Sequence, residues 1–217
     1  MIGGGYEFVA PGTMNSTSPD LITRLAQAYL TLDYDLFVLA PEDFQALSAA
    51  GVPTAPSWWS LDDAPRVVTQ KVPDGLLAFV LFPPSLPGGP SGSTASILAN
   101  TATQLRESGQ YNLIIGISTW GQPLENDFIA NRRGKAFDII LGSGHGPSYP
   151  GLYLQDNAVL WVRPSLKGKG VNTIVIPNLP KAGTKPVWSP NVTVMATVQP
   201  LRDELALDPA ITTIFAP

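Results

Sequence analysis

The stretch that decides the fold is YNLIIGISTWGQPLENDFIANRRGKAFDIILGSGHGP, residues 111–147. It holds two apolar runs, residues 113–117 and 137–141, on either side of a segment with helical spacing. Each run is too short for a helix and too apolar to face water, so both are predicted to be strands of a buried parallel sheet. The expected order is strand, loop, helix, strand and loop.

Small polar residues follow both predicted strands. Ligands of α/β proteins bind beyond the carboxyl ends of the strands, so these two loops are expected to form the pocket. The candidate ligand-binding residues are Ser118, Thr119, Gly142, Ser143, Gly144 and His145.

Length and composition favour a single globular domain over residues 1–217, with 44% hydrophobic residues for its core. A net charge of −4 and a charged fraction of 14% do not suggest the basic face that nucleic-acid binding needs. No apolar run approaches the roughly 20 residues of a membrane span. The chain has no cysteine, which excludes disulfides, thiolate metal sites and cysteine nucleophiles. MIGGGYEFVA at the N-terminus lacks the basic and apolar regions of a signal peptide, so none is expected in this chain.

The first third of the chain is predicted to alternate strands and helices. Strands are expected at 6–10 and 35–40, and a short helix from Pro41 to residue 50. Ser18 and Pro19 form a strong helix start. The apolar side of that helix is predicted to hold Leu21, Leu25, Ala28 and Leu32. Residues 51–64 are expected to be irregular.

The remaining segments favour a mixed sheet, or two sheets packed face to face. A hairpin is predicted where VPDG, residues 72–75, separates two apolar strands. Residues 83–93 are interpreted as a surface loop, and Gly109 as the stop of the helix that follows. The other predicted elements are strands at 158–163, 172–176 and 187–198, and a helix at 208–215.

Three phrases of the sequence carry a family resemblance. YDLFVLAPEDF at 34–44 takes the place of a phrase ending Leu-Gly-Asn-His-Glu-Phe. ISTWG at 117–121 replaces Leu-Ser-His-x-Gly, and DIILGSGHG at 138–146 replaces Asp-x-Ile-x-Gly-Gly-His-x-His. In this order they resemble the calcineurin-like metallophosphoesterases of the 5′-nucleotidase and 2′,3′-cyclic phosphodiesterase group. The resemblance covers most of the chain and implies an α/β (α+β) fold: mixed β-sheets packed face to face with flanking helices, a four-layer sandwich.

The same resemblance implies that the family's metal site is lost. That site uses aspartates, an asparagine and several histidines to hold two ions, which clamp a phosphoryl oxygen and activate water. This chain has one histidine. Other residues stand at the matched ligand positions: Pro41, Glu42, Thr119, Gly144 and Gly146. A further aspartate position falls near residues 12–13, and the family's first strand has no counterpart. No metal ligand is therefore assigned.

Four side chains are candidates for residual catalysis: Glu42, Asp43, Thr119 and His145. His145 is expected to be accessible, and a loop histidine held by backbone hydrogen bonds is its simpler interpretation. Glu42 and Asp43 are more simply helix N-terminal acids favoured by the macrodipole. A Ser-His-acid arrangement is not favoured, because no nucleophile-elbow glycine pattern surrounds Ser118 or Thr119.

Four further acids, Asp62, Asp63, Glu125 and Asp127, are predicted to be solvated loop and helix residues. Arg132 and Arg133 are expected to end a helix, where cations are favoured, and the basic loop 163–170 is interpreted as a turn with solvated lysines. The tryptophans are interpreted either as core residues or as contacts for a partner: Trp58, Trp59, Trp120 and Trp161.

The leading hypothesis is a non-catalytic, metallophosphatase-like domain (a pseudoenzyme) that binds a protein partner or self-associates and needs no cofactor. The alternative is a diverged phosphoesterase or nucleotidase-type hydrolase that uses Glu42, Asp43 and His145, with a divalent metal only in that case. A missing N-terminal piece carrying the first ligands is a third interpretation, but it would not restore Thr119 or Pro41. The resemblance alone favours a periplasmic or extracellular bacterial protein.

Overall fold

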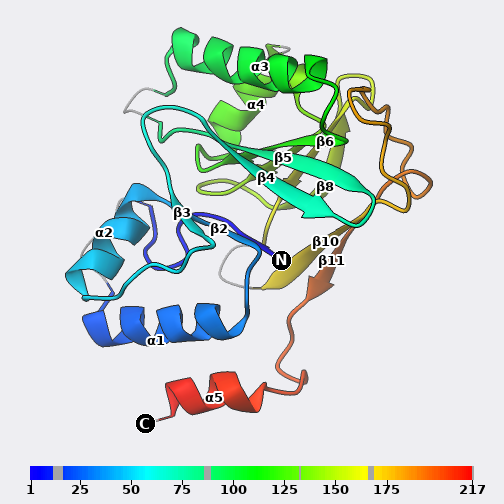
Figure 1. The fold of residues 1–217 in the computed structure, drawn as a ribbon. Coiled ribbons are helices and arrows are strands. Elements are labelled where there is room, and N and C mark those ends of the chain that lie inside the picture. The colour runs from blue at the N-terminus through cyan, green and yellow to red at the C-terminus, as the bar shows by residue number, and fades with distance from the viewer. Residues whose placement is uncertain (12–16, 86–88, 132, 166–168, 217) are drawn as a thin grey trace. The chain divides into compact units, whose positions relative to one another are not determined.

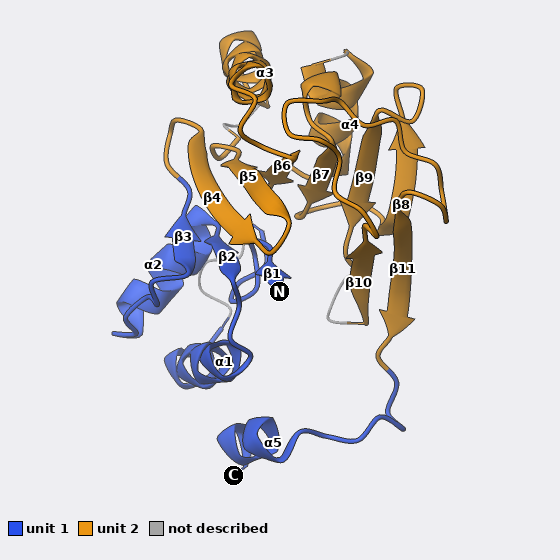
Figure 2. Ribbon diagram, turned by 45° about the vertical axis from the view of Figure 1, so that its right-hand side comes forward, with its two compact units in different colours: residues 1–61, 202–217 blue, residues 62–201 orange. Residues whose placement is uncertain are grey.

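The computed structural model describes residues 1–11, 17–85, 89–131, 133–165 and 169–216 (Figure 1). The chain divides into two compact units (Figure 2). Unit 1 comprises residues 1–61 and 202–217, and unit 2 comprises residues 62–201. The prediction of a single domain over residues 1–217 stays a prediction.

Unit 1 is built on a parallel sheet with strand order β1-β2-β3. Its strands are β1 (Ile2–Gly3), β2 (Leu36–Leu39) and β3 (Trp58–Ser60), and its helices are α1 (Pro19–Thr31), α2 (Pro41–Ala49) and α5 (Pro209–Phe215). The hydroxyl oxygen of Ser18 accepts a hydrogen bond from the backbone N–H of Leu21 at 3.2 Å, which confirms the predicted start of α1. Arg24 of α1 donates to the carbonyl oxygens of Ile214 and Ala216 and so joins α5 to this unit.

Two predictions for unit 1 are wrong, and a third is wrong for two of its four residues. Residues 6–10 form no strand, because Asp43 accepts the backbone N–H groups of this segment. Residues 51–64 contain β3, whose Trp58 stacks on Phe37 with ring centroids 5.2 Å apart. The buried residues of α1 are Ile22, Ala26 and Ala28, whereas Leu21 and Leu32 are 40% and 41% exposed.

Unit 2 contains a six-stranded mixed sheet with strand order β4-β5-β6-β7-β9-β8. Its strands are β4 (Arg66–Val72), β5 (Gly75–Leu81), β6 (Leu113–Ser118), β7 (Ile139–Gly142), β8 (Tyr149–Leu154) and β9 (Val159–Arg163). β5, β6, β7 and β9 run parallel, and the predicted hairpin of β4 and β5 is confirmed. β8, an antiparallel edge strand, was not predicted.

Helices cover one face of this sheet (Figure 1). They are α3 (Gly92–Glu107) and α4 (Gln122–Ala130), with the 3₁₀ turn η1 (Arg133–Ala136). Phe82, Phe128 and Phe137 meet in the core, where a Cβ on Gly116 would lie 2.8 Å from the Phe82 ring. A glycine in mid-strand therefore makes room for an aromatic cluster.

A two-stranded antiparallel ribbon completes unit 2, formed by β10 (Gly170–Val175) and β11 (Met195–Pro200). The predicted strand 187–198 begins only at Met195, because Trp188 turns inward and its indole N–H donates to the carbonyl oxygen of Asp138 at 2.9 Å. Mixed sheets with flanking helices, the predicted fold class, are thus confirmed. Among the residues that the structure describes, no helix is long and apolar enough to cross a membrane.

Candidate functional site

The loops that follow β6 and β7 lie side by side, because the strands are parallel neighbours with Ser118 in register with Gly142. The backbone N–H of Ser143 donates to the carbonyl oxygen of Ser118 at 2.8 Å, and the Ser143 hydroxyl donates to the same oxygen at 3.0 Å. Further along, the N–H of Gln122 donates to the carbonyl oxygen of His145 at 2.7 Å. The structure thus brings the six candidate ligand-binding residues into one pair of loops.

These two loops pack directly on each other. A Cβ on Gly142 would overlap the carboxylate of Glu125, and one on Gly144 would lie 3.0 Å from the carbonyl oxygen of Thr119. Gly144 also has φ 78°, which favours glycine. Ser118 is fully buried and Thr119 is only 6% exposed. Gly144 is therefore needed for contact between the loops, and Gly142 makes room for the carboxylate of Glu125 on α4.

A buried ion pair lies next to the loop that follows β7. Glu125 of α4 and Arg163 of β9 are each 1% exposed, and the Arg163 guanidinium donates to Glu125 Oε2. The indole N–H of Trp161 donates to the same oxygen at 3.0 Å. Glu125 was predicted to be solvated, and that prediction is wrong. α4 turns its first-turn acid towards the sheet, where β9 supplies the guanidinium.

Arg163 also fixes the shape of the loop after β7. Its Nη2 donates to the carbonyl oxygens of Gly144 and His145, both at 2.9 Å. Its Nε donates to the carbonyl oxygen of Pro147 at 3.1 Å. One planar group with five N–H donors therefore holds three loop carbonyls and one carboxylate together.

Burial raises the pKa of Glu125, and the charge and hydrogen bonds of Arg163 and the hydrogen bond from Trp161 oppose that rise. The other carboxylate oxygen, Oε1, is buried without a hydrogen-bond partner among the described residues. The Glu125 carboxylate thus depends on Arg163 and Trp161 to offset the cost of its burial.

The candidates in unit 2 differ in access. His145 is exposed, as predicted, and its backbone carbonyl oxygen is held by Gln122 and Arg163. Thr119, in the loop after β6, is buried. The solvated acids of this unit include Asp127, which is exposed, as are Asp62 and Asp63.

The candidates in unit 1 open helix α2. Glu42 is half-buried, whereas Asp43 is completely buried. The Asp43 carboxylate accepts four backbone N–H groups at 2.6 to 3.2 Å, from Tyr6, Phe8, Val9 and Ala40. Burial raises the pKa of Asp43, and these hydrogen bonds oppose the rise. Asp43 therefore ties residues 6–9 to the start of α2.

Within the described ranges, no three or more His, Asp or Glu side chains are grouped so that they could hold a metal ion. The residues at the matched ligand positions do not fit a two-metal site. Pro41, Gly144 and Gly146 have no side-chain ligand, and Thr119 is buried. The predicted aspartate position at 12–13 lies outside the described residues. So do 86–88 of the loop 83–93, Arg132, and 166–168 of the basic loop.

A third buried acid, Asp138, was missed by sequence reasoning. Its Oδ1 accepts hydrogen bonds from Arg106 at 2.6 Å and Lys185 at 3.0 Å, and its Oδ2 accepts the N–H of Ile114 at 2.8 Å. Burial lowers the pKa of Lys185 to about 8, against the opposing charge of Asp138. Asp138 precedes β7, at the strand end opposite the candidate loops, so this cluster anchors the segment around Trp188.

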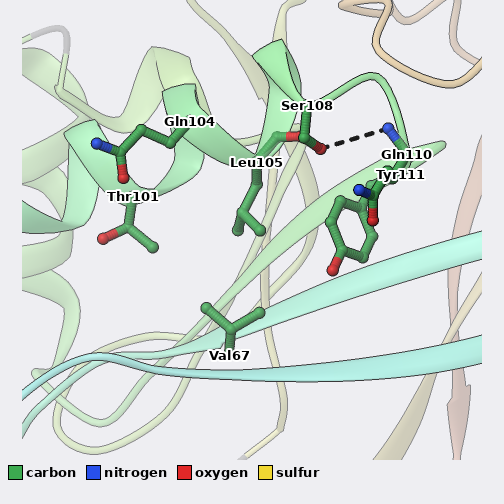
Figure 3. A pocket seen from close by; sticks show the side chains of 7 residues that line it. All are labelled: Val67, Thr101, Gln104, Leu105, Ser108, Gln110 and Tyr111. Carbon is green, nitrogen blue, oxygen red and sulfur yellow. Dashed lines mark hydrogen bonds between the residues drawn. The ribbon is translucent and has the colours of Figure 1, made fainter.

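Most of the tryptophans are core residues. Trp58, Trp120, Trp161 and Trp188 are all at most 7% exposed, and Trp59 is partly buried. A hollow of about 370 Å³ lies elsewhere in unit 2, between α3 and β4 (Figure 3). Its lining is Val67, Thr101, Gln104, Leu105, Ser108, Gln110 and Tyr111. It contains no acid, histidine or lysine and lies apart from the two loops.

No protein-family model and no curated protein sequence matches the chain. Among solved structures, the sulfate thiohydrolase SoxB of Thermus thermophilus in complex with glycerol matches with a TM-score of 0.61 and 15% identity. The match covers 92% of this chain and 38% of SoxB, so the chain spans well under half of that protein.

Two further structures match with lower TM-scores. A hypothetical protein from Thermus thermophilus has 12% identity and a TM-score of 0.40, over 75% of this chain and 73% of its own. GAP50, the anchor in the inner membrane complex of Plasmodium, has 15% identity and a TM-score of 0.44, over 92% and 67%. On the likeness to SoxB and on its own mixed sheets, the chain has a metallophosphatase-like α/β fold.

Proposed function

We propose that this chain is a non-catalytic metallophosphatase-like domain, a pseudoenzyme that works as a binding or assembly module with a protein partner. The observation that carries the proposal is the packing of the two loops after β6 and β7. Where the family resemblance places metal ligands, this chain has Thr119, which is buried, and glycines in contact with the neighbouring loop. A two-metal site needs converging oxygen and nitrogen ligands, and these residues offer none.

The buried carboxylates support the same proposal. Asp43 accepts four backbone hydrogen bonds, and Glu125 is bound by Arg163 and Trp161. Recruiting either group as a metal ligand would break interactions that hold its own unit together. Both acids are therefore interpreted as structural.

One observation favours the alternative of a diverged phosphoester hydrolase. His145 presents an exposed imidazole at the carboxyl end of the sheet, the edge where α/β proteins bind ligands. A single histidine could serve as one metal ligand or as a general base. The experiment therefore includes a variant at this position.

The test measures metal binding and turnover together. The purified chain is incubated with Mn²⁺ and Zn²⁺, dialysed and analysed for metal content, beside His145→Ala. Melting is followed with and without the ions, and hydrolysis of nitrophenyl phosphate mono- and diesters is assayed. A metal site would add about 2.7 kcal/mol of stability at a free metal concentration of about 100 times its Kd.

We expect no stoichiometric metal, no metal-dependent rise in Tm and no turnover above that of the His145→Ala variant. Stoichiometric metal that disappears in His145→Ala, together with ester hydrolysis, would overturn the proposal in favour of the hydrolase. Asp127→Asn, an exposed acid on α4, is the matched control for nonspecific cation binding.

A further inference from the structure

The β10–β11 ribbon has an open edge. Within the part of the chain that the structure describes, β11 pairs with β10 alone. Thr197, Val198, Gln199 and Pro200 are exposed along it. An edge strand with unpaired backbone groups is a template for another strand.

The register fixes which backbone groups of β11 are free to pair. The N–H of Leu201 donates to the carbonyl oxygen of Lys169 at 3.0 Å, so these residues form a hydrogen-bonded pair. Alternate residues of an antiparallel strand turn both backbone groups to the same side. With Thr197 opposite Thr173, Thr197 points its backbone groups to β10, while Ala196 and Val198 point theirs away.

The position of Pro200 is consistent with this orientation. Like Ala196 and Val198, Pro200 turns its backbone groups away from β10, and proline is tolerated in a sheet where its missing N–H would face outward. The open edge therefore offers two N–H donors, on Ala196 and Val198, and the neighbouring carbonyl oxygens as acceptors.

This edge lacks the usual protection against pairing. The outer strands of the six-stranded sheet carry Arg66 and Lys71 on β4 and Pro150 on β8, which discourage strand addition. By contrast, residues 170–180 and 186–201 contain no Asp, Glu, Lys or Arg, in a chain with 14% charged residues. A surface without charge is also where two copies, each with a net charge of −4, can approach with least repulsion.

We propose that β11 pairs antiparallel with β11 of a second copy of this chain, about a two-fold axis at Thr197. Ala196 then exchanges both backbone hydrogen bonds with Val198 of the second copy, and the reverse pair repeats them. The free backbone groups of both residues are satisfied, as an isologous interface requires. The two ribbons join into a four-stranded sheet with the order β10-β11-β11-β10. This inference rests on the proposed function and names the second copy as its partner.

A second copy fits this edge because the pairing is self-complementary. Thr197 faces Thr197 of the second copy, a favourable cross-strand pair, and Met195 faces Gln199 of the second copy. The open strand can be followed in Figure 2, where β11 lies beside β10 in unit 2.

The test places charge on the axis. Thr197→Lys puts two like charges directly opposite each other, about 5 Å apart, and should weaken dimerisation about fivefold or more. Thr173→Lys is the matched control, since Thr173 is the exposed neighbour of Thr197 on β10. Its copies would be three strand spacings apart, about 14 Å, which exceeds the screening length of about 8 Å at physiological salt.

The mass in solution is measured by sedimentation and light scattering over a range of concentrations, against a monomer of 23.1 kDa. We expect a concentration-dependent dimer that Thr197→Lys or Thr197→Glu weakens and Thr173→Lys leaves unchanged. Mixing the Thr197→Lys and Thr197→Glu variants should restore dimers, which also shows that both variants are folded.

A monomer at every concentration would overturn the inference. So would a dimer that Thr197→Lys does not weaken, or one that Thr173→Lys weakens equally. These results would leave the proposed function intact, because only metal binding together with ester hydrolysis would overturn it.

Discussion

Removing the guanidinium of Arg163 tests whether the loop after β7 depends on one buried ion pair. Arg163→Met keeps much of the side-chain length but leaves Glu125 as an uncompensated buried carboxylate. Breaking a buried pair by removing one partner typically costs about 3–5 kcal/mol. The carbonyl oxygens of Gly144, His145 and Pro147 also lose their donor. The expected loss is therefore at least about 3 kcal/mol at pH 7, or about 6 °C or more in Tm for a chain of this size.

The charge of Glu125 gives this loss a definite pH dependence. Without Arg163, the folded-state pKa of Glu125 rises further above its unfolded value, so the folded protein binds the extra proton. The stability of Arg163→Met therefore falls as pH rises from the unfolded-state pKa of Glu125 to its folded-state pKa. The free-energy cost of the substitution shrinks towards pH 4.5. Urea unfolding followed by tryptophan fluorescence at pH 7 and pH 5 measures both costs.

A double-mutant cycle separates the ion pair from the loop contacts. Glu125→Gln removes the charge and keeps an acceptor for Trp161, so adding it to Arg163→Met should recover about 1–3 kcal/mol. Asp127→Asn on the same helix is the control and should change stability by less than about 0.5 kcal/mol. A cost below about 1 kcal/mol for Arg163→Met, or strict additivity in the cycle, would refute the ion-pair account.

Three other substitutions or conditions have expected outcomes. Because burial lowers the pKa of Lys185 to about 8 from 10.5, the unfolded chain binds the extra proton between these values, and stability should rise with pH there by up to about 3 kcal/mol. This rise in stability should vanish in Lys185→Met when urea unfolding is compared at pH 7.5 and 9.5. Above pH 10 the stability should fall, since burial raises the pKa of Tyr6 to about 12. Asp43→Asn replaces an acceptor of four N–H groups and should lower the free energy of unfolding by about 2–4 kcal/mol, with faster hydrogen exchange at Phe8 and Val9. Unchanged exchange at these two residues would contradict the role of Asp43 in holding residues 6–9. Gly142→Ala should cost about 1–3 kcal/mol in chemical unfolding because its Cβ meets Glu125, whereas Gly92→Ala, with nothing within 4 Å, should be neutral or stabilising.

The central strands could be predicted because burial on both faces leaves a continuous apolar run. β6 and β7 are such strands, and their parallel pairing followed from the helix between them. The same logic failed at residues 6–10, where an apolar stretch gives its N–H groups to a carboxylate 34 to 37 residues away. Local pattern cannot reveal an acceptor that the fold brings from elsewhere.

The polar core of the candidate loops was also beyond local reasoning. Glu125 and Arg163 are 38 positions apart, and each taken alone has the sequence context of a surface charge. Their pairing depends on how α4 lies over β9, which sequence spacing does not encode. The adjacency of Ser118 and Gly142 was predictable, because neighbouring parallel strands bring their carboxyl ends to one edge. Convergence of the loops at 41–44 and 142–147 stays a prediction.

The discontinuity of unit 1 bears on how the protein is made. Arg24 reaches carbonyl groups 190 and 192 positions later, so α1 cannot complete its contacts until Ile214 and Ala216 have left the ribosome. Unit 2 is continuous in sequence, from 62 to 201, and its strands become available in one uninterrupted run. Since domains generally fold as units during synthesis, we expect protease resistance to appear first in residues 62–201 of nascent chains. Translation speed after residue 201 would then matter more to unit 1 than to unit 2, because the early segment of unit 1 waits for α5 to be made.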